Sequence, residues 1–191
     1  MPIRPRTDTA DLIQADAVLQ PLTDEFFARP ALVVARALIG KCLVRDLPSG
    51  EQRIWPITET EAYIGAHDLA CHGRFGETPR TAVMFGPAGQ WYVYFIYGMY
   101  WMLNVVTNTP GVPAAVLIRA AGPANGPGKL TKQLGITRAE NGLAVKPASK
   151  LWIADAGVRV PKKELVRTPR IGVDYAGEWK NRLYRFVWKY A

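Results

Sequence analysis

The chain of 191 residues holds 24 Lys and Arg against 16 Asp and Glu, which gives a formal net charge of +8, and 49% of its residues are hydrophobic. This length predicts one domain that buries about two-thirds of its unfolded surface. No apolar run reaches the roughly 18 residues that a membrane helix needs, and no secretory signal follows the N-terminal arginines. The basic charge favours a polyanionic partner such as nucleic acid without identifying a substrate.

The cysteines and histidines are too few for disulfide or metal chemistry. Cys42 and Cys71 cannot form a disulfide framework, so we expect reduced thiols in an intracellular protein. A zinc site needs paired ligands at short spacing. His67 and His72 are the only histidines, and no such pairing exists. The sequence therefore predicts a protein without metal or cofactor.

The first elements expected along the chain are an arm and a helical region. Residues 1–20 show little periodicity and are expected to form an arm outside a single domain, residues 21–191. Thr23 is a suitable N-cap for a helix with an acidic first turn. Pro30 suits a helix start, and apolar residues then recur at helical spacing until Gly40.

The rest of the chain is dominated by short strand signals between Gly and Pro turns. Strands are expected at residues 41–46, 53–64, 90–97, 100–107, 114–120, 151–154, 170–174 and 183–189. We expect a loop with one helical turn near Asp68 over 65–82, and a short helix from Gly126 to Gly135. Gly98 suits the first central position of a type II′ turn. Because hairpins outnumber helices, we predict an α+β fold: one domain on a curved antiparallel sheet, with short flanking helices and a protruding hairpin.

The strand at 53–64 carries a pair of carboxylates. Glu59 and Glu61 share one face with Tyr63, because side chains alternate along a strand. Burying a carboxylate is costly unless it is paired or hydrated. The pair therefore indicates either a solvated acidic edge or a general base held beside a pocket and oriented toward water.

His72 lies in a glycine-containing loop with two arginines. A single histidine is more often a structural hydrogen-bonding group than a catalytic one. Gly73 and Gly76, however, leave space for another molecule. Arg74 and Arg80 are candidates for contacts with phosphates.

The aromatic run from Trp91 to Tyr100 has two interpretations. It is either a strand buried on both sides or a set of rings that stack against a flat heterocycle. Tyr97 lies beside the predicted turn, where a bulky side chain is seldom part of a core and can act as a wedge between stacked bases. Asn104, a polar residue in the apolar returning strand, needs partners and is a candidate for reading a base edge.

Taken in order, these segments resemble the alkyladenine (3-methyladenine or methylpurine) DNA glycosylase family. The resemblance covers most of the chain except residues 1–20 and 137–169, and it depends on the order and spacing of the motifs. The matching motifs are Leu38-Ile39-Gly40-Lys41, Glu59-Thr60-Glu61-Ala62-Tyr63, Thr78-Pro79-Arg80, Tyr92 to Tyr100, Leu117-Ile118-Arg119-Ala120, Gly126-Pro127-Gly128-Lys129-Leu130 and Ala176-Gly177-Glu178-Trp179.

The resemblance implies catalytic and DNA-contacting roles. Glu61 matches the family's general base, which activates water. Arg119 matches an arginine that helps to hold this water, together with the backbone near Val173. Glu59 receives no role. The candidates for contacts with the DNA backbone are Arg74, Arg80 and Lys129.

The resemblance also implies how a base is bound. Tyr63, His72 and Tyr94 match the residues that sandwich the extruded base. Asn104 matches a pocket asparagine that can clash with the 2-amino group of guanine. Tyr97 matches the tyrosine that intercalates and fills the gap left in the duplex.

The activity implied is repair of double-stranded DNA that contains damaged purines such as 3-methyladenine. The base must be flipped out, because its glycosidic bond is hidden in the duplex, and hydrolysis then leaves an abasic site. No lysine nucleophile is recognisable, so strand cleavage is not expected. We expect a monomer without membrane attachment, in the cytoplasm of a bacterium or the nucleus of a eukaryote.

Two other functions fit parts of the pattern. An O-glycoside hydrolase could use Glu59 and Glu61, because residues i and i+2 of a strand lie about 6.6 Å apart. A cationic surface, however, gives no advantage with neutral sugars. A non-catalytic DNA-binding module that stacks on bases accounts for the charge and the aromatic residues but leaves Glu61 unexplained.

Overall fold

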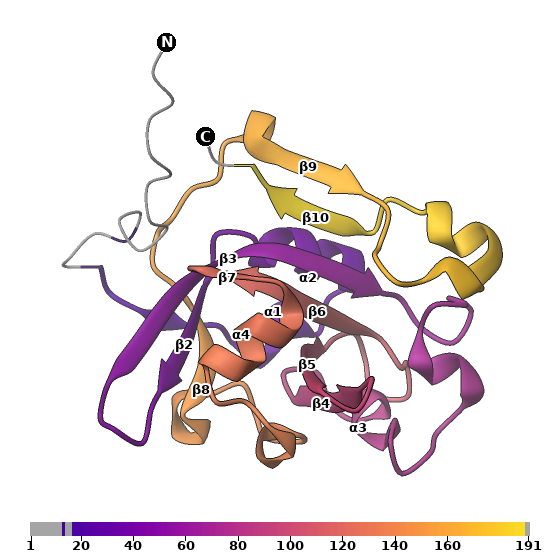
Figure 1. Ribbon diagram of the computed structural model, residues 1–191, viewed down its shortest axis with the longest axis horizontal. Helices are drawn as coiled ribbons and strands as arrows, with labels where there is room; N and C mark the ends of the chain where they lie inside the picture. Colours follow the sequence, from indigo (N-terminus) through magenta and orange to yellow (C-terminus); the bar gives the residue numbers. More distant parts are fainter. Residues whose placement is uncertain (1–12, 14–16, 190–191) are drawn as a thin grey trace.

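The computed structural model describes residue 13 and residues 17–189. In this part of the chain ten strands form one antiparallel sheet, in the order β1-β8-β2-β3-β6-β5-β4, with β10 paired to β3, β9 to β10 and β7 to β6. The strands are β1 (Gln20–Pro21), β2 (Cys42–Asp46), β3 (Gln52–Tyr63), β4 (Trp91–Ile96), β5 (Tyr100–Val106), β6 (Ala115–Ala121), β7 (Ala124–Asn125), β8 (Leu151–Asp155), β9 (Leu165–Thr168) and β10 (Arg185–Trp188). Figure 1 shows the paired strands β9 and β10 across the top of the view, next to β3.

The helices are short. The α-helices are α1 (Asp24–Phe27), α2 (Ala31–Leu38), α3 (Ala82–Phe85) and α4 (Pro127–Gln133), and the 3-10 turns are His72–Phe75, Arg138–Glu140, Pro147–Ser149, Lys162–Glu164 and Asp174–Asn181. Pro30 precedes α2, where its fixed φ and missing N–H do no harm. Gly40 follows α2 with φ +86°, and a Cβ there would lie 2.7 Å from Val160 Cγ2, so only glycine fits this close approach.

β3 is the strand on which the sheet curls. Its first half pairs with β2, and its second half lies between β6 and β10. The pairing with β6 shifts register between Ile57 and Thr60, around Glu59. Such bulges bend a strand and re-aim its side chains. The bend thus falls on the segment that carries both carboxylates.

The main hydrophobic core lies between the sheet and α2. Four residues at helical spacing on α2 are buried: Ala31, Val34, Ala35 and Leu38. The Thr60 hydroxyl on β3 donates to the Ala35 carbonyl at 2.8 Å. Each large apolar side chain buried here contributes about 1.5–3 kcal/mol. α2 thus covers the Thr60 face of β3 and leaves the alternate face, with Glu59, Glu61 and Tyr63, for the site.

The predicted fold class is confirmed. The sheet is antiparallel and curled, and the helices are few and short. Seven of the predicted strands and the helix at α4 are present, with ends within two residues of the expected positions. Most of the predicted arm, residues 1–20, lies outside the described residues. None of the described helices is long and apolar enough to cross a membrane.

The strand predicted at 170–174 is wrong, because the strand (β9) lies earlier in the chain. Pro169 has no N–H to pair, and Gly172 has φ +76°. Arg170 is only 5% exposed, and its guanidinium binds the Asp68 carboxylate at 2.5 and 2.8 Å. The buried pair holds this segment as a loop against the site.

The turn predicted for the hairpin of β4 and β5 is also wrong. Gly98 does not occupy the first central position. Tyr97 and Gly98 both have positive φ, +54° and +66°, and the Met99 N–H donates to the Ile96 carbonyl at 3.2 Å. Positive φ at both central residues is the pattern of a type I′ turn, whose twist matches the flanking strands.

The helical turn expected near Asp68 lies instead at His72–Phe75. The Asp68 carboxylate accepts backbone N–H groups from Ile64 and Ala70 at 3.3 and 3.0 Å, besides the Arg170 guanidinium. Asp68 therefore organises the loop through its side chain and is not part of a helix.

Candidate active site

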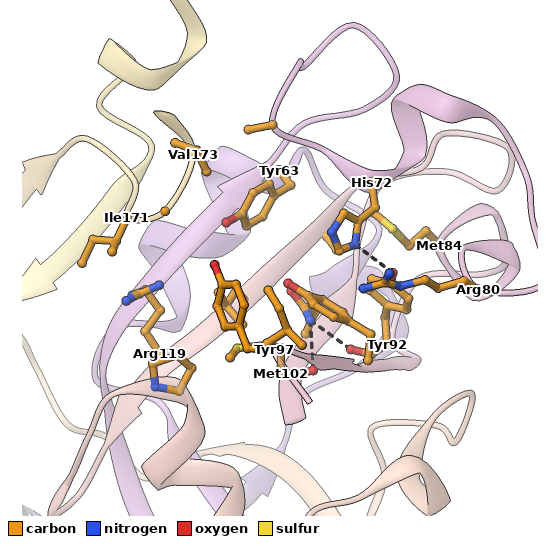
Figure 2. A pocket seen from close by; sticks show the side chains of 18 of the residues that line it. Tyr63, His72, Arg80, Met84, Tyr92, Tyr97, Met102, Arg119, Ile171 and Val173 are labelled. Atoms are coloured by element: carbon orange, nitrogen blue, oxygen red, sulfur yellow. Dashed lines mark hydrogen bonds between the residues drawn. The ribbon is translucent and has the colours of Figure 1, made fainter. Parts of the chain in front are cut away.

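A cavity of about 450 Å³ opens between the β4–β5 hairpin, the 3-10 turn at His72–Phe75 and the loop at 171–175. Seven of the ten predicted site residues line it: Tyr63, His72, Arg80, Tyr94, Tyr97, Asn104 and Arg119. Figure 2 shows Tyr63, His72, Tyr97 and Arg119 gathered around this space. Glu61, Arg74 and Lys129 are not among the lining residues.

Glu61 lies directly behind the cavity wall, with no exposed surface. Its Oε1 accepts the Ile171 N–H at 2.8 Å and lies 3.3 Å from Arg119 Nη1. Its Oε2 accepts the Tyr63 hydroxyl at 2.9 Å. Burial raises the pKa of the Glu61 carboxyl, and the attraction of Arg119 opposes this rise. The result is a desolvated carboxyl with partners suited to its ionised form.

Glu59 binds arginines on both sides. Arg119 Nε and Arg185 Nε each donate to Glu59 Oε1 at 2.6 Å. Arg119 therefore bridges Glu59 and Glu61, and β10 supplies the second cation. Charge-assisted bonds of this length are the strong ones, so Glu59 holds Arg119 in place.

Tyr63 forms part of the wall in front of Glu61. The Arg170 guanidinium carbon lies 4.8 Å from the centre of the Tyr63 ring. The Asp68–Arg170 ion pair, whose side chains have no exposed surface, therefore packs beside the Tyr63 ring and supports it.

His72 is held by a chain of hydrogen bonds. Its Nδ1 lies 3.0 Å from the Tyr92 hydroxyl (Figure 2), and that hydroxyl also hydrogen-bonds the Arg80 guanidinium. A guanidinium only donates, so Tyr92 accepts from Arg80 and its hydroxyl proton is available to His72 Nδ1. Burial, together with the charge of Arg80, lowers the pKa of His72 to about 4. The ring is therefore neutral, and this arrangement favours the tautomer with its proton on Nε2.

The remaining predicted pocket residues complete the wall. The His72 and Tyr94 rings lie 4.6 Å apart at an interplanar angle of 68°. Asn104 is 2% exposed, and its Nδ2 donates to the Tyr92 and Met102 carbonyls at 3.0 and 3.2 Å. Both amide protons are thus used, which leaves the Asn104 carbonyl oxygen as the group able to read a base edge.

The three basic residues predicted to contact phosphates differ in their position relative to the cavity. Arg80 is exposed but lines the cavity, 5.3 Å from the centre of the Tyr94 ring. Arg74 is half-buried beside Phe75, and Lys129 is exposed on α4. These positions surround the cavity and do not form one patch inside it.

Several site residues were not predicted from the sequence. Tyr92 could have been found, because it shares the period of two with Tyr94. Met84 and Met102 line the cavity as apolar filling. Ile171 and Arg185 have no local signal, since each meets its carboxylate across more than 100 residues of chain.

Comparison with known proteins identifies a family and similar proteins. The model of the Methylpurine-DNA glycosylase (MPG) family matches residues 25–191. A protein of Myxococcus xanthus is 53% identical over 173 residues, covering 86% of this chain and 88% of the relative. One of Methanocella arvoryzae is 49% identical over 185 residues (86% and 90%), and one of Psychrobacter cryohalolentis is 42% identical over 206 residues (93% and 96%). All three carry the provisional name 3-methyladenine DNA glycosylase.

A match over most of the chain, together with the aromatic cavity and its buried glutamate, defines a DNA glycosylase. More specifically, the chain belongs to the methylpurine-DNA glycosylase family. The family resemblance of the sequence motifs is thereby confirmed.

Proposed function

We propose that this protein removes alkylated purines such as 3-methyladenine from double-stranded DNA by hydrolysing the N-glycosidic bond. The observation that carries the proposal is Glu61, a fully buried carboxylate in contact with Arg119 behind a cavity of tyrosine and histidine side chains. Family membership and the provisional names of the relatives support the same activity.

The damaged base is extruded into the cavity. Tyr63, His72 and Tyr94 sandwich it, and Tyr97 intercalates in the duplex. Extrusion costs a few kcal/mol, and each stacking contact returns about 1–3 kcal/mol. An N-alkylated purine carries positive charge, which strengthens its attraction to tyrosine rings and makes it a good leaving group.

Glu61 then acts as the general base. A water bound between Glu61, Arg119 and the 171–173 backbone loses a proton to the carboxylate and attacks the anomeric carbon. The purine leaves with the electrons of the glycosidic bond, which cancels its positive charge. Arg119 keeps Glu61 ionised, while burial keeps the carboxylate basic.

Hydrolysis is the only chemistry that the proposal includes. A lyase step needs an amine that attacks the sugar. No lysine lines the cavity in the described part of the chain. The product is therefore an abasic site in an unbroken strand.

An O-glycoside hydrolase is the less suitable alternative. Such an enzyme needs two carboxyl groups that face the substrate. Glu59 is bound by Arg119 and Arg185, so it is not available as a second carboxyl group. A non-catalytic stacking module leaves the buried Glu61 without a purpose.

The setting follows from the substrate. The protein acts as a monomer on duplex DNA that carries damaged purines, in the compartment that holds the DNA: the cytoplasm of a bacterium or the nucleus of a eukaryote. Arg74, Arg80 and Lys129 surround the cavity and supply phosphate contacts.

The test is release of free methylpurine from methylated duplex DNA in the presence of EDTA. We expect release by the wild type and a rate about 10²–10⁴-fold lower for Glu61→Gln, which still binds the duplex. Glu51→Gln, at an exposed glutamate of the β2–β3 turn, is the control and keeps the wild-type rate. A normal rate for Glu61→Gln would disprove its role as base, and strand breaks in the product would disprove the hydrolysis-only reaction.

A further inference from the structure

Exposed hydrophobic side chains gather around the cavity. Among the described residues, twelve large hydrophobic side chains are more than 40% exposed, and eight of them belong to segments beside the cavity. Four are on the β4–β5 hairpin: Phe95, Tyr97, Met99 and Tyr100. The other four, here called the loop rim, are Leu69, Phe75, Ile171 and Tyr175. Such a concentration of exposed apolar surface marks an interaction site, and the wedge role of Tyr97 accounts only for the hairpin.

The loop rim is firmly anchored. The buried Asp68–Arg170 pair joins its two segments, and a small cluster of Ala70, Val173 and Ala176 packs between them. Figure 1 shows these two loops, around residues 70 and 175, side by side at the right of the view. A Cβ on Gly73 would collide with Pro113, so the turn that carries Phe75 packs closely against the connection that leads into β6. The surface is therefore preorganised for a partner.

An arginine lies between the two rings of the loop rim. The Arg74 guanidinium carbon is 4.3 Å from the centre of the Phe75 ring and 5.7 Å from that of Tyr175. Phe75 is 72% exposed and Tyr175 is 61% exposed. None of the ion pairs in the described residues involves Arg74. A cation that takes part in none of these ion pairs and lies beside exposed rings is suited to a phosphate and a base or sugar at once.

We propose that Arg74 and Phe75 bind the nucleotide next to the extruded one in the damaged strand. Phe75 packs against the base or sugar of that nucleotide, and Arg74 contacts its phosphate. Tyr175 lines the cavity and also contacts the Arg74 guanidinium, so it marks the path from the extruded base to this subsite. The inference rests on the proposed function, because extrusion into the cavity is what brings the strand to the loop rim.

The first experiment compares single-turnover base release at increasing enzyme concentration. For Phe75→Ala we expect the half-saturating concentration to rise about tenfold, as for loss of one stacked base. The rate at saturation stays within about twofold, since Phe75 does not touch the reacting bond. Phe75→Trp keeps a ring and restores binding, whereas Phe75→Leu does not. Val33→Ala, at a 47% exposed position on α2, is the matched control without effect.

The second experiment locates the contact. Binding is measured with duplexes that hold a tetrahydrofuran abasic analogue and are cut short on one side of it. We expect the difference in Kd between wild type and Phe75→Ala to disappear when the duplex is cut short on one side of the analogue. It persists when the duplex is cut short on the other side. Arg74→Gln lowers the slope of log Kd against log salt by about one, because one phosphate contact is lost.

Failure of this inference is distinct from failure of the proposed function. If Phe75→Ala binds as tightly as the wild type, while methylpurine release and its loss in Glu61→Gln are intact, only the subsite is wrong. An equal loss with both truncated duplexes also overturns it, since it would show a general effect on binding. Absence of release by the wild type would overturn the proposed function itself.

Discussion

At the scale of single residues, the role proposed for Glu61 opposes the stability of the folded protein. It has no exposed surface, and burial raises the pKa of its carboxyl although Arg119 is adjacent. The folded protein therefore binds this proton more tightly than the unfolded chain does. Ionisation of Glu61 lowers the free energy of unfolding, and the loss develops as the pH rises above the unfolded-state pKa.

The variant Glu61→Gln carries no buried charge at this position, so we expect it to raise Tm at pH 7. The rise is about 2–4 °C for each kcal/mol by which the free energy of unfolding increases. At a pH of about 3.5, below the unfolded-state pKa of about 4.3, the wild-type carboxyl is protonated in both states and the gain disappears. Thermal unfolding followed by circular dichroism at the two pH values measures this. A lower Tm for the variant at pH 7 would contradict the expected sign.

Tyr92→Phe tests the hydrogen-bond chain that ends at His72. Without the hydroxyl, nothing in the chain from Arg80 fixes the tautomer, so we expect the Nδ1–H form to become populated. Because the chain has only two histidines, ¹⁵N NMR in a His67→Gln background reports His72 alone. A tautomer unchanged by Tyr92→Phe would mean that another group determines it.

Much of the residue-level site could be predicted from the sequence. Alternation along one strand placed Glu61 and Tyr63 on the same face, whereas only the family resemblance indicated that Tyr94 belongs to the pocket. The resemblance implied a backbone contribution near Val173, but neither the N–H of Ile171 as its donor nor the guanidinium of Arg185 could be foreseen from the residues. A backbone donor has no sequence signature, and an arginine that pairs with a distant carboxylate looks like any surface arginine.

At the scale of elements, the β4–β5 hairpin holds its tyrosine in an unfavourable conformation. Tyr97 has φ +54° and is 74% exposed. A non-glycine residue in this region costs about 1 kcal/mol or more. This backbone strain occurs at the residue proposed to intercalate in the duplex. Filling the gap left by an extruded base needs a large ring, which glycine lacks.

Replacing this residue should separate stability from DNA binding. Tyr97→Gly removes the strain, so we expect the free energy of unfolding to rise by about 1 kcal/mol in urea titrations, while affinity for duplex DNA falls. Gly98→Ala is the counterpart: φ is +66° and no atom lies within 4 Å of the added Cβ, so only conformational strain lowers stability. Duplex affinity equal to the wild type for Tyr97→Gly would rule out the wedge role.

The two strands of this hairpin were predictable because their signal is local. The turn type was not, since Gly98 suits either central position and the twist of the strands decides between them. The strand at 170–174 failed for a related reason. Its apolar residues suit a strand, but the buried bond from Arg170 to Asp68, over 100 residues away, holds them in a loop.

At the scale of the molecule, the Asp68–Arg170 pair joins the middle of the chain to its last quarter. Both side chains are fully buried, and Arg170 also donates to the Ala62 carbonyl at 2.9 Å. Removing one partner of a buried pair leaves the other charge without compensation, which costs about 3–5 kcal/mol.

We expect Asp68→Asn to lower the free energy of unfolding by about that amount in urea titrations, with Glu51→Gln as a neutral control. Base release should fall as well, because Arg170 supports Tyr63 and the loop that reaches Glu61. A loss below about 1 kcal/mol, the value typical of exposed pairs, would show that the pair is hydrated in solution.

The overall architecture followed from simple patterns, since hairpin signals and few helices specify an antiparallel α+β fold. The pairing of β10 with β3 did not follow from such patterns. It joins strands that are far apart in the sequence, and which of them pair depends on all the strands of the sheet. The bulge at Glu59 likewise has no signature in the residues that form it.

The order in which the chain is made bears on when it can act. On a ribosome, Glu61 and the tyrosines of β3 and the β4–β5 hairpin emerge long before Ile171 and Arg185, which hold Glu61 and Glu59. A nascent chain made only as far as Arg119 lacks the backbone donor, the second arginine and the 171–175 wall of the cavity. On the proposed function, the site becomes competent only after the segment that follows Arg170 has been made and has packed against β3.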